Sequence, residues 1–233
     1  MTHKKHFTIK SKSGRDGEVA YIVEMYQAML DALGPRGWWP GRTRFEICVG
    51  AILTQNTAWR NVTKAISNLR DAKLLDPRAM HEISPEKLAA LIVPSGYYNI
   101  KAKRLQNFTS MLMDEFGGSL NRLFSLPMME LRGKLLSVNG VGMETADSII
   151  LYAAKKPIFV VDAYTRRIGF RHGLFDDEAD YETMRMFFTK RLPEDVALFN
   201  EYHALIVCVG NRYCSKEPNC GECPLRGYLP YCD

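Results

Sequence analysis

The sequence lacks any long apolar run. None of its 233 residues belongs to an uninterrupted apolar stretch of the ~18 residues that a membrane-spanning helix needs. Its first residues, MTHKKHFTIKSKSGRDG, are polar and basic and lack the apolar centre of a signal peptide. The sequence also contains no internal repeat and no low-complexity tract. We therefore expect a cytoplasmic protein with no membrane partner.

Neither sign of charge dominates strongly. The 31 Lys and Arg residues against 26 Asp and Glu residues give a net charge of +5. This excess suits a polyanionic partner such as nucleic acid but does not require one. A hydrophobic fraction of 46% and a charged fraction of 24% are typical of a globular protein with a packed core.

Strand patterns are nearly absent. Only Pro157–Val161 resembles a strand, and an isolated run of this kind is expected to be an extended segment that leads into a helix. Elsewhere, apolar residues recur with helical periodicity between short segments rich in glycine and proline. The helical patterns cover about 18–33, 45–55, 62–72, 86–92, 100–116, 128–136, 144–154, 163–170, 181–191 and 195–212. The expected fold class is all-α.

Cysteine is scarce outside the end of the chain. Of the six cysteines, only Cys48 lies away from the C-terminal group. That group consists of Cys208, Cys214, Cys220, Cys223 and Cys232. Because a reducing cytosol disfavours structural disulfides, a cluster of this kind predicts a metal site.

A Gly-x-Gly turn joins two expected helices within Leu136–Ala146. Gly140 and Gly142 allow a close approach of the backbone to another surface, and the following helix, which contains Thr145, presents unpaired N–H groups. Such a device can hold a DNA phosphate without reading sequence. An ordinary helical hairpin with glycine caps is the alternative interpretation.

Asp162 follows the apolar run and directly precedes a helical pattern. An aspartate in this position is typically an N-cap. Together with the Gly140–Gly142 hairpin, it resembles the helix–hairpin–helix and catalytic aspartate of the endonuclease III superfamily of base-excision DNA glycosylases. The resemblance implies that Asp162 caps its helix and faces the sugar of the damaged nucleotide. There it would stabilise oxocarbenium-like charge and help orient an attacking water.

The C-terminal cysteines also resemble this superfamily. Cys214, Cys220, Cys223 and Cys232 are separated by five, two and eight residues, whereas the usual [4Fe–4S] loop has gaps of six, two and five. The resemblance implies a [4Fe–4S] cluster held by these four residues in a loop over 214–232. A four-cysteine zinc site is the chemical alternative, and Cys208 is an alternative first ligand.

Glu144 stands two residues after Gly142. Bifunctional members of the superfamily carry a lysine there, which attacks the sugar and forms a Schiff base. A carboxylate cannot do so. The resemblance therefore implies a monofunctional enzyme that uses water, with Asp162 and Glu144 as the candidate catalytic residues. An enzyme with lyase activity stays open as an alternative.

All three tryptophans fall within one short part of the chain. Trp38, Trp39 and Pro40, with Trp59 just after Gln-Asn-Thr, resemble the 3-methyladenine-excising branch of the superfamily. The resemblance implies that these rings sandwich an extruded base. Methylated purines are cationic, and stacking on tryptophan favours a cation by about 0.5–2 kcal/mol. The alternative is that the three rings belong to the core.

Two further segments are expected to open the duplex. By resemblance, Gln55 fills the gap left by the flipped nucleotide, and Tyr97 intercalates from a loop that includes Asn99. The basic residues that follow could meet phosphates or lie on a solvated helix face. These residues are Lys101, Lys103 and Arg104.

The resemblance implies two helical domains on either side of a DNA-binding cleft. Residues 38–153 would form a six-helix barrel with the helix–hairpin–helix at about 128–154. Residues 1–37 and 154–233 would form the second domain. The expected partner is double-stranded DNA with a damaged base, bound by a monomer. The functional hypotheses are a monofunctional glycosylase for alkylated purines such as 3-methyladenine, a bifunctional glycosylase and AP lyase for oxidised or mismatched pyrimidines, and a non-catalytic iron–sulfur DNA-binding protein.

Overall fold

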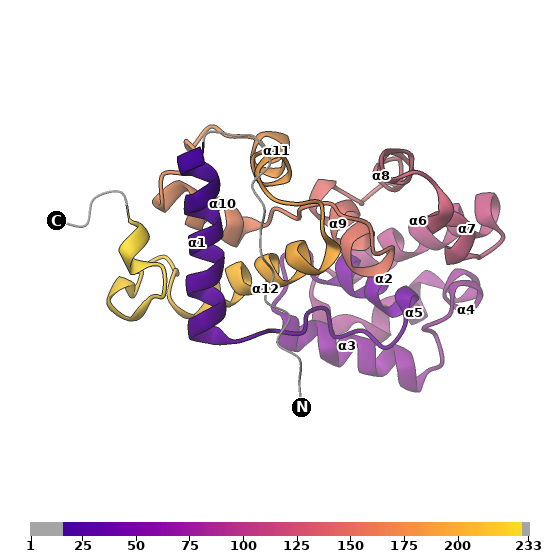
Figure 1. Ribbon diagram of the computed structural model, residues 1–233. Coiled ribbons are helices and arrows are strands. Elements are labelled where there is room, and N and C mark those ends of the chain that lie inside the picture. The colour runs from indigo at the N-terminus through magenta and orange to yellow at the C-terminus, as the bar shows by residue number, and fades with distance from the viewer. Residues whose placement is uncertain (1–15, 230–233) are drawn as a thin grey trace, which may run out of the picture. The chain divides into compact units, whose positions relative to one another are not determined.

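The computed structural model of the protein describes residues 16–229 (Figure 1). Within that range every regular element is a helix or a helical turn and none is a strand, so the predicted all-α class is confirmed. None of the described helices is long and apolar enough to cross a lipid bilayer. The chain divides into two compact units. Unit 1 consists of Met1–Trp38 and Pro157–Asp233, and unit 2 consists of Trp39–Lys156.

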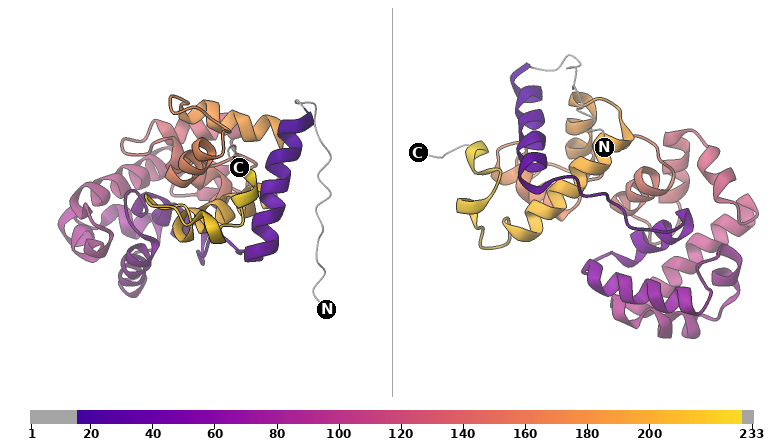
Figure 2. Two further views of the ribbon diagram at one scale, coloured as in Figure 1. Left: turned by 90° about the vertical axis from the view of Figure 1, so that its left-hand side faces the viewer. Right: turned by 60° about the horizontal axis from the view of Figure 1, so that its bottom comes forward.

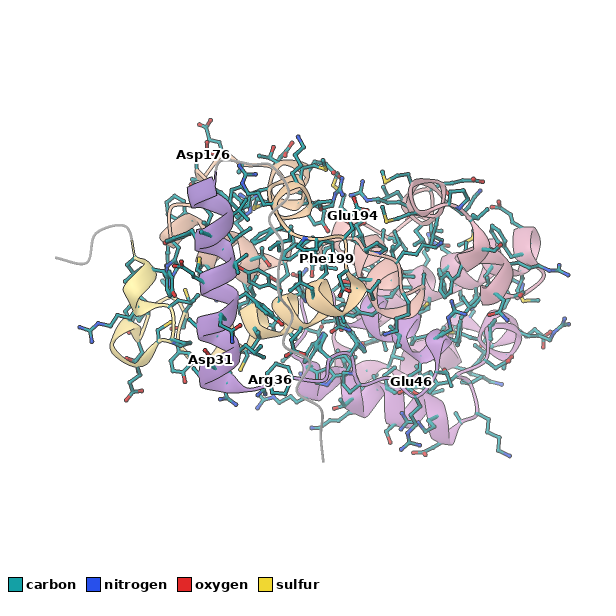
Figure 3. All side chains as sticks on the ribbon, viewed as in Figure 1. Asp31, Arg36, Glu46, Asp176, Glu194 and Phe199 are labelled. Carbon is teal, nitrogen blue, oxygen red and sulfur yellow. The ribbon has the colours of Figure 1, made fainter. Side chains whose placement is uncertain are left out.

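Unit 2 is built around helix α2. Its elements are α2 (Arg44–Leu53), α3 (Trp59–Asp71), α4 (Pro77–Glu82), α5 (Pro85–Leu91), η1 (Val93–Ser95), α6 (Tyr98–Phe116), α7 (Leu120–Ser125), α8 (Met128–Leu136), α9 (Met143–Ser148) and η2 (Ile149–Ala153). Helix α2 is buried from Phe45 to Leu53 and packs against α3, α6, α9 and η2. A helix that is buried on all sides forms the centre of a core. Glu46, labelled on α2 in Figure 3, is its buried charged residue.

Unit 1 has an aromatic core. Its elements are α1 (Asp16–Leu33), α10 (Ala163–Arg171), α11 (Tyr181–Arg191), α12 (Val196–Arg212), η3 (Cys220–Glu222) and η4 (Arg226–Tyr228). Phe159 stacks on Phe188 with 4.0 Å between ring centroids, and Phe199, labelled in Figure 3, meets Phe159 edge-on at 5.5 Å. The Tyr202 hydroxyl donates to the Ile22 carbonyl at 2.6 Å. This buried hydrogen bond ties α12 to α1.

The segment after α12 returns to α1, as the two views of Figure 2 show. Tyr21 of α1 donates from its hydroxyl to the Tyr228 carbonyl, and the two rings meet edge-on at 5.6 Å. Nδ1 of His172, at the end of α10, lies 2.9 Å from the same carbonyl. These contacts fix η4 against α1 and α10.

The sequence pattern does not predict helices α4 and α7. Each is six residues long and begins at a capping side chain. Asp76 accepts from the Ala79 amide at 3.0 Å, and Ser119 accepts from the Arg122 amide at 3.3 Å. Helices this short do not repeat an apolar face, so periodicity cannot reveal them.

The helical pattern expected over 144–154 is divided in the structure. Helix α9 ends at Ser148, and the chain continues as the π-helical turn η2 over five buried residues. Such π turns are rare and often lie near functional sites. The strand-like run at 158–161 is buried and forms no strand, so it is an extended connection to α10, as expected.

Candidate active site and nucleic-acid interface

The helix–hairpin–helix of unit 2 consists of α8, a turn and α9. Gly140 has φ +95°, and a Cβ atom added there would lie 2.3 Å from Cγ of Arg104 on α6. Gly142 has φ −87°, and a Cβ atom there would meet nothing within 4 Å. Asn107 of α6 donates from Nδ2 to the Asn139 carbonyl at 3.0 Å. Helix α6 therefore holds the hairpin, and only Gly140 needs to be glycine for its conformation.

A buried ion pair joins the two helices of the hairpin. Arg132 of α8 donates to both carboxylate oxygens of Asp147 on α9, at 2.7 and 3.2 Å. The Asp147 side chain is fully buried. Because a bidentate guanidinium–carboxylate pair fixes orientation as well as distance, it sets the angle at which α9 leaves the turn.

Gln55 lies at the hairpin. Its Nε2 donates to the Gly140 carbonyl at 3.0 Å and to Thr145 Oγ1 at 2.9 Å, while Arg104 donates to its Oε1. Thr145 is buried, and its hydroxyl accepts the hydrogen bond from Gln55 within unit 2. The gap-filling role of Gln55 stays a prediction, and the structure places its amide within a hydrogen-bond network.

The expected wedge loop precedes α6. Tyr97 has φ +46° and is 69% exposed, and Gly96 before it has φ +65°. Asn99 is exposed in the first turn of α6. A bulky residue with positive φ is unusual and must be held by its surroundings. The loop presents an aromatic side chain on a constrained backbone.

The basic residues at the start of α6 do not form a single row. Lys103 is exposed, as the sequence interpretation expected of a surface cation. Lys101 is 1% exposed, and Arg104 contacts Gln55. The surface interpretation is therefore wrong for Lys101, because Lys101 faces the interior of unit 2.

Trp39 and Trp59 lie in contact in unit 2. Their rings meet edge-on with 5.0 Å between centroids, and Trp39 also packs against Tyr152 at 5.0 Å and beside Gly50. A base stacked between two rings needs about 7 Å between them, twice a van der Waals contact of ~3.5 Å. These two rings therefore do not enclose a base between them in this arrangement. Trp38 is half-buried at the end of the N-terminal part of unit 1.

A cavity of about 160 Å³ lies beside the two rings. Its lining consists of Trp39, Pro40, Gly41, Glu46, Trp59, Thr63, Ile66 and Arg70. Arg70 donates to the buried Glu46 carboxylate at 2.9 Å. Neither Glu46 nor Arg70 is a candidate from the sequence, because no motif marks them and only the fold brings α2 and α3 together.

Asp162 is the N-cap of α10 in unit 1. Its Oδ1 accepts from the Thr165 amide at 2.7 Å and from the Thr165 hydroxyl at 2.9 Å. Its side chain is 12% exposed. The capping role that the sequence predicts is present. The positive end of the α10 dipole lies beside this carboxylate, whose orientation the two hydrogen bonds fix.

His203 of α12 faces the other carboxylate oxygen of Asp162. Its Nε2 lies 3.7 Å from Oδ2, and its side chain is 6% exposed. Burial lowers the pKa of His203, although the Asp162 carboxylate opposes that shift. Sequence reasoning missed this residue, since a lone histidine in a helical apolar pattern carries no motif.

Glu144 is exposed in the first turn of α9. An acidic residue there is favourable because it lies at the positive end of the helix dipole. Its role as a candidate catalytic residue stays a prediction. Asp162 belongs to unit 1, and Glu144, Gln55 and Trp59 belong to unit 2.

Two arginines of α10 hold the start of the cysteine loop. Arg167 donates from Nε to the Cys214 carbonyl at 2.6 Å. Arg171 donates from Nη1 to Cys214 Sγ at 3.2 Å and to the Ser215 carbonyl at 2.8 Å.

Cys220 and Cys223 follow Cys214 in this loop. Burial raises the pKa of the Cys223 thiol, and the nearby Cys214 and Cys220 sulfurs raise it further. Cys208 lies on α12 and does not contribute to that shift. In the described part of the chain, no three side chains of His, Cys, Asp or Glu form a metal-binding group. Cys232 lies outside the described residues.

Comparison with known proteins connects these features. The model of a family described as "HhH-GPD superfamily base excision DNA repair protein" matches residues 49–194. A Methanocaldococcus jannaschii protein named as a DNA repair glycosylase is 43% identical over 215 residues, which cover 92% of this chain and 98% of that protein. Endonuclease III of Thermotoga maritima is 31% identical over 192 residues, which cover 80% and 83%.

Solved structures share the fold. H. pylori 3-methyladenine DNA glycosylase bound to 1,N6-ethenoadenine is similar with a TM-score of 0.72 at 29% identity, over 82% of this chain and 97% of that chain. A trapped endonuclease III–DNA covalent intermediate has a TM-score of 0.78 at 22% identity, over 94% and 97%. The chain therefore belongs to the HhH-GPD superfamily of base excision DNA repair proteins, the endonuclease III superfamily of DNA glycosylases.

Proposed function

We propose that this protein is a monofunctional DNA glycosylase that hydrolyses the N-glycosidic bond of alkylated purines. The observation that carries the proposal is the Asp162 carboxylate. One of its oxygens is fixed by the Thr165 amide and hydroxyl, and the other faces His203. A carboxylate held in this way cannot turn away from a developing positive charge, which is the property that electrostatic preorganisation requires.

In the proposed reaction the bond between the sugar C1′ and the base nitrogen breaks first, and its electron pair leaves with the base. The sugar becomes oxocarbenium-like, and the Asp162 carboxylate stabilises that charge. Water then bonds to C1′ and releases a proton to the solvent. A base that already carries a positive charge is a good leaving group because it departs as a neutral molecule.

Glu144 supports the use of water. A bifunctional mechanism needs an amine at this place in the hairpin, and a carboxylate cannot form a Schiff base. Glu144 is exposed in the first turn of α9, next to the hairpin that would meet DNA in the proposal. The reaction would then end at an abasic site without a strand break.

The tryptophans support an alkylated base. Trp59 is backed by Trp39, which packs against Tyr152, so the Trp59 ring is held rigidly. In the proposal, the base stacks on Trp59 or Trp38, and Trp39 supports the Trp59 ring from behind. The H. pylori protein that is 29% identical is named for 3-methyladenine, a base of this class, and this similarity supports the proposal.

The proposal is tested by base release from duplexes that contain 3-methyladenine, thymine glycol or uracil. We expect release of the methylated purine and a loss of at least about 100-fold in its rate for Asp162→Asn, from the lost charge at the sugar. Asp180→Asn is the matched control, because Asp180 caps α11 in the same way through Thr183. Equal effects of the two substitutions would show that the loss is structural.

A second candidate is a bifunctional glycosylase and AP lyase for oxidised pyrimidines. Its support is the 31% identity to endonuclease III of T. maritima. Borohydride reduction during the reaction separates the two candidates. A trapped covalent adduct between protein and DNA would favour this second candidate, and its absence on a processed lesion would favour the first.

We also propose that the C-terminal loop holds a [4Fe–4S] cluster through Cys214, Cys220, Cys223 and Cys232. The chemistry of the donor set supports this, because four cysteine thiolates are the usual ligands of such a cluster and Arg171 donates to Cys214 Sγ. Hydrogen bonds to ligand sulfurs are a common feature of such sites. The bound cluster would supply a structural cross-link at the end of the chain, and no step of the proposed reaction depends on it.

A further inference from the structure

Lys101 of α6 is buried, with 1% of its surface exposed. Its Nζ donates three hydrogen bonds, to the Leu53 carbonyl at 2.7 Å, to Thr57 Oγ1 at 2.6 Å and to the Ser95 carbonyl at 2.7 Å. An ammonium has three donors and no acceptor, so each of its N–H groups has a partner. Burial of this charge is costly, and burial together with the Arg104 guanidinium lowers the pKa of Lys101 to about 8.

The three acceptors belong to two segments that are far apart in sequence. Leu53 and Thr57 flank the turn after α2 that carries Gln55, and Ser95 precedes the loop that carries Tyr97. The Thr57 hydroxyl also donates to the Ser95 carbonyl. Lys101 and Thr57 together therefore join the two segments, which we call the glutamine turn (54–57) and the tyrosine loop (95–98).

Both segments contain a residue with left-handed backbone. Asn56 has φ +52° in the glutamine turn, and Tyr97 has φ +46° in the tyrosine loop. Such conformations are unfavourable for residues other than glycine and persist only when contacts hold them. Asn56 and Tyr97 are both exposed, so neither is held by burial of its own side chain. Lys101 bonds beside each of them, to Thr57 next to Asn56 and to Ser95 two residues before Tyr97.

We propose that Lys101 is a positioning residue that couples the glutamine turn and the tyrosine loop, so that they open the DNA duplex as one unit. The inference rests on the proposed function of the two segments. Unstacking a base costs free energy, and an inserted side chain offsets that cost only if its own backbone keeps its position. Lys101 does not touch DNA in this proposal. It limits the relative movement of the glutamine turn and the tyrosine loop, which touch DNA in the proposal.

A purely structural role for Lys101 makes a different prediction. Loss of folding stability would weaken the binding of every DNA equally. Loss of coupling would weaken only binding that requires a paired duplex to be opened. The two roles are therefore separated by comparing a paired duplex with DNA that is already unpaired at the same position.

The experiment measures binding of two fluorescent DNAs at one salt concentration. Both contain an abasic-site analogue, which lies in a fully paired duplex in one DNA and in an unpaired bubble in the other. For Lys101→Met we expect about tenfold weaker binding to the paired duplex, the size of one lost buried hydrogen bond, and a change below about twofold for the bubble. Thr57→Val removes the shared hydroxyl and should act in the same direction, and it serves as the test if Lys101→Met does not fold. Lys103→Met, the exposed neighbour, should change binding to both DNAs alike.

Equal weakening of both DNAs by Lys101→Met and Thr57→Val, or no weakening of either, would overturn the proposal. The same holds if the unmodified protein does not distinguish the abasic duplex from an intact one. Catalysis is not needed for this measurement. If the proposed glycosylase activity fails in the base-release assay, the binding result still stands, so the two failures can be told apart.

Discussion

Gln55 makes three hydrogen bonds with its side-chain amide, to Gly140, Thr145 and Arg104, all within unit 2. If Gln55 fills the gap left by a flipped nucleotide, it must either break these hydrogen bonds or enter the gap while it keeps them. The network therefore predicts that part of the effect of any Gln55 substitution is on stability.

A double-mutant cycle measures that part. Gln55→Ala and Thr145→Val should each destabilise the protein by about 1–3 kcal/mol, because each leaves a polar partner unsatisfied. The double variant should show a coupling of about 0.5–1.5 kcal/mol, measured by urea denaturation. A coupling near zero would mean that the Gln55–Thr145 bond does not persist in solution.

His203 and His172 predict how stability depends on pH. Burial lowers the pKa of both below the ordinary value of 6.5, so each folded imidazole resists protonation. As pH falls below 6.5, the unfolded chain gains protons that the folded chain does not, and stability is lost in the window between 6.5 and the lowered pKa. Denaturation midpoints should decrease over this range, and His203→Gln should reduce the decrease. An unchanged pH dependence in His203→Gln would show that His203 is not buried in neutral form.

Lys101, Lys103 and Arg104 show where prediction from the sequence stops at the residue scale. The three cations lie within four consecutive residues, yet one is buried, one is exposed and one bonds to Gln55. Their positions around α6 depend on which neighbours the helix has, and those neighbours come from residues 53–57 and 139–140. No local pattern contains that information.

At the scale of elements, the two glycines of the hairpin are equivalent in the sequence motif but not in the structure. Gly140→Ala should destabilise the protein by about 1–3 kcal/mol, because alanine is unfavourable at φ +95° and its Cβ would displace Arg104. Gly142→Ala should change stability by less than about 1 kcal/mol, since its φ is ordinary and the space is open. Thermal unfolding of both variants provides the comparison. Equal destabilisation would contradict the difference in their backbone conformations.

The long helices were predictable because their apolar positions repeat over several turns. The expected ranges 100–116, 128–136 and 181–191 agree closely with α6, α8 and α11. The six-residue helices α4 and α7 each begin at a single capping side chain, and the π turn after α9 consists of five buried residues. Both kinds of feature are too short to repeat an apolar position over several turns, so a periodic pattern does not reveal them.

At the scale of the whole molecule, each unit carries a different part of the proposed chemistry. Unit 2 supplies the hairpin, the glutamine turn and the tyrosine loop, all tied to α6, and unit 1 supplies Asp162 with His203. The motifs of the sequence identify the residues that touch DNA in the proposal. They do not reveal that His203 faces Asp162 or that Lys101 bonds to both segments, because those contacts form only in the fold.

The cysteine loop gives the last prediction, because it determines how the end of unit 1 is held. Purified protein should contain iron and acid-labile sulfide and absorb visible light as iron–thiolate centres do. Cys214→Ser and Cys223→Ser should lose that absorption and lower the unfolding temperature, since ligand binding contributes to folding. Cys208→Ser is the matched control, because Cys208 lies on α12 and does not affect the Cys223 thiol.

Zinc without iron in the purified protein would support a four-cysteine zinc site instead. Loss of iron from Cys208→Ser with retention in Cys214→Ser would make Cys208 the first ligand, and the contact between Arg171 and Cys214 would then have only a packing role.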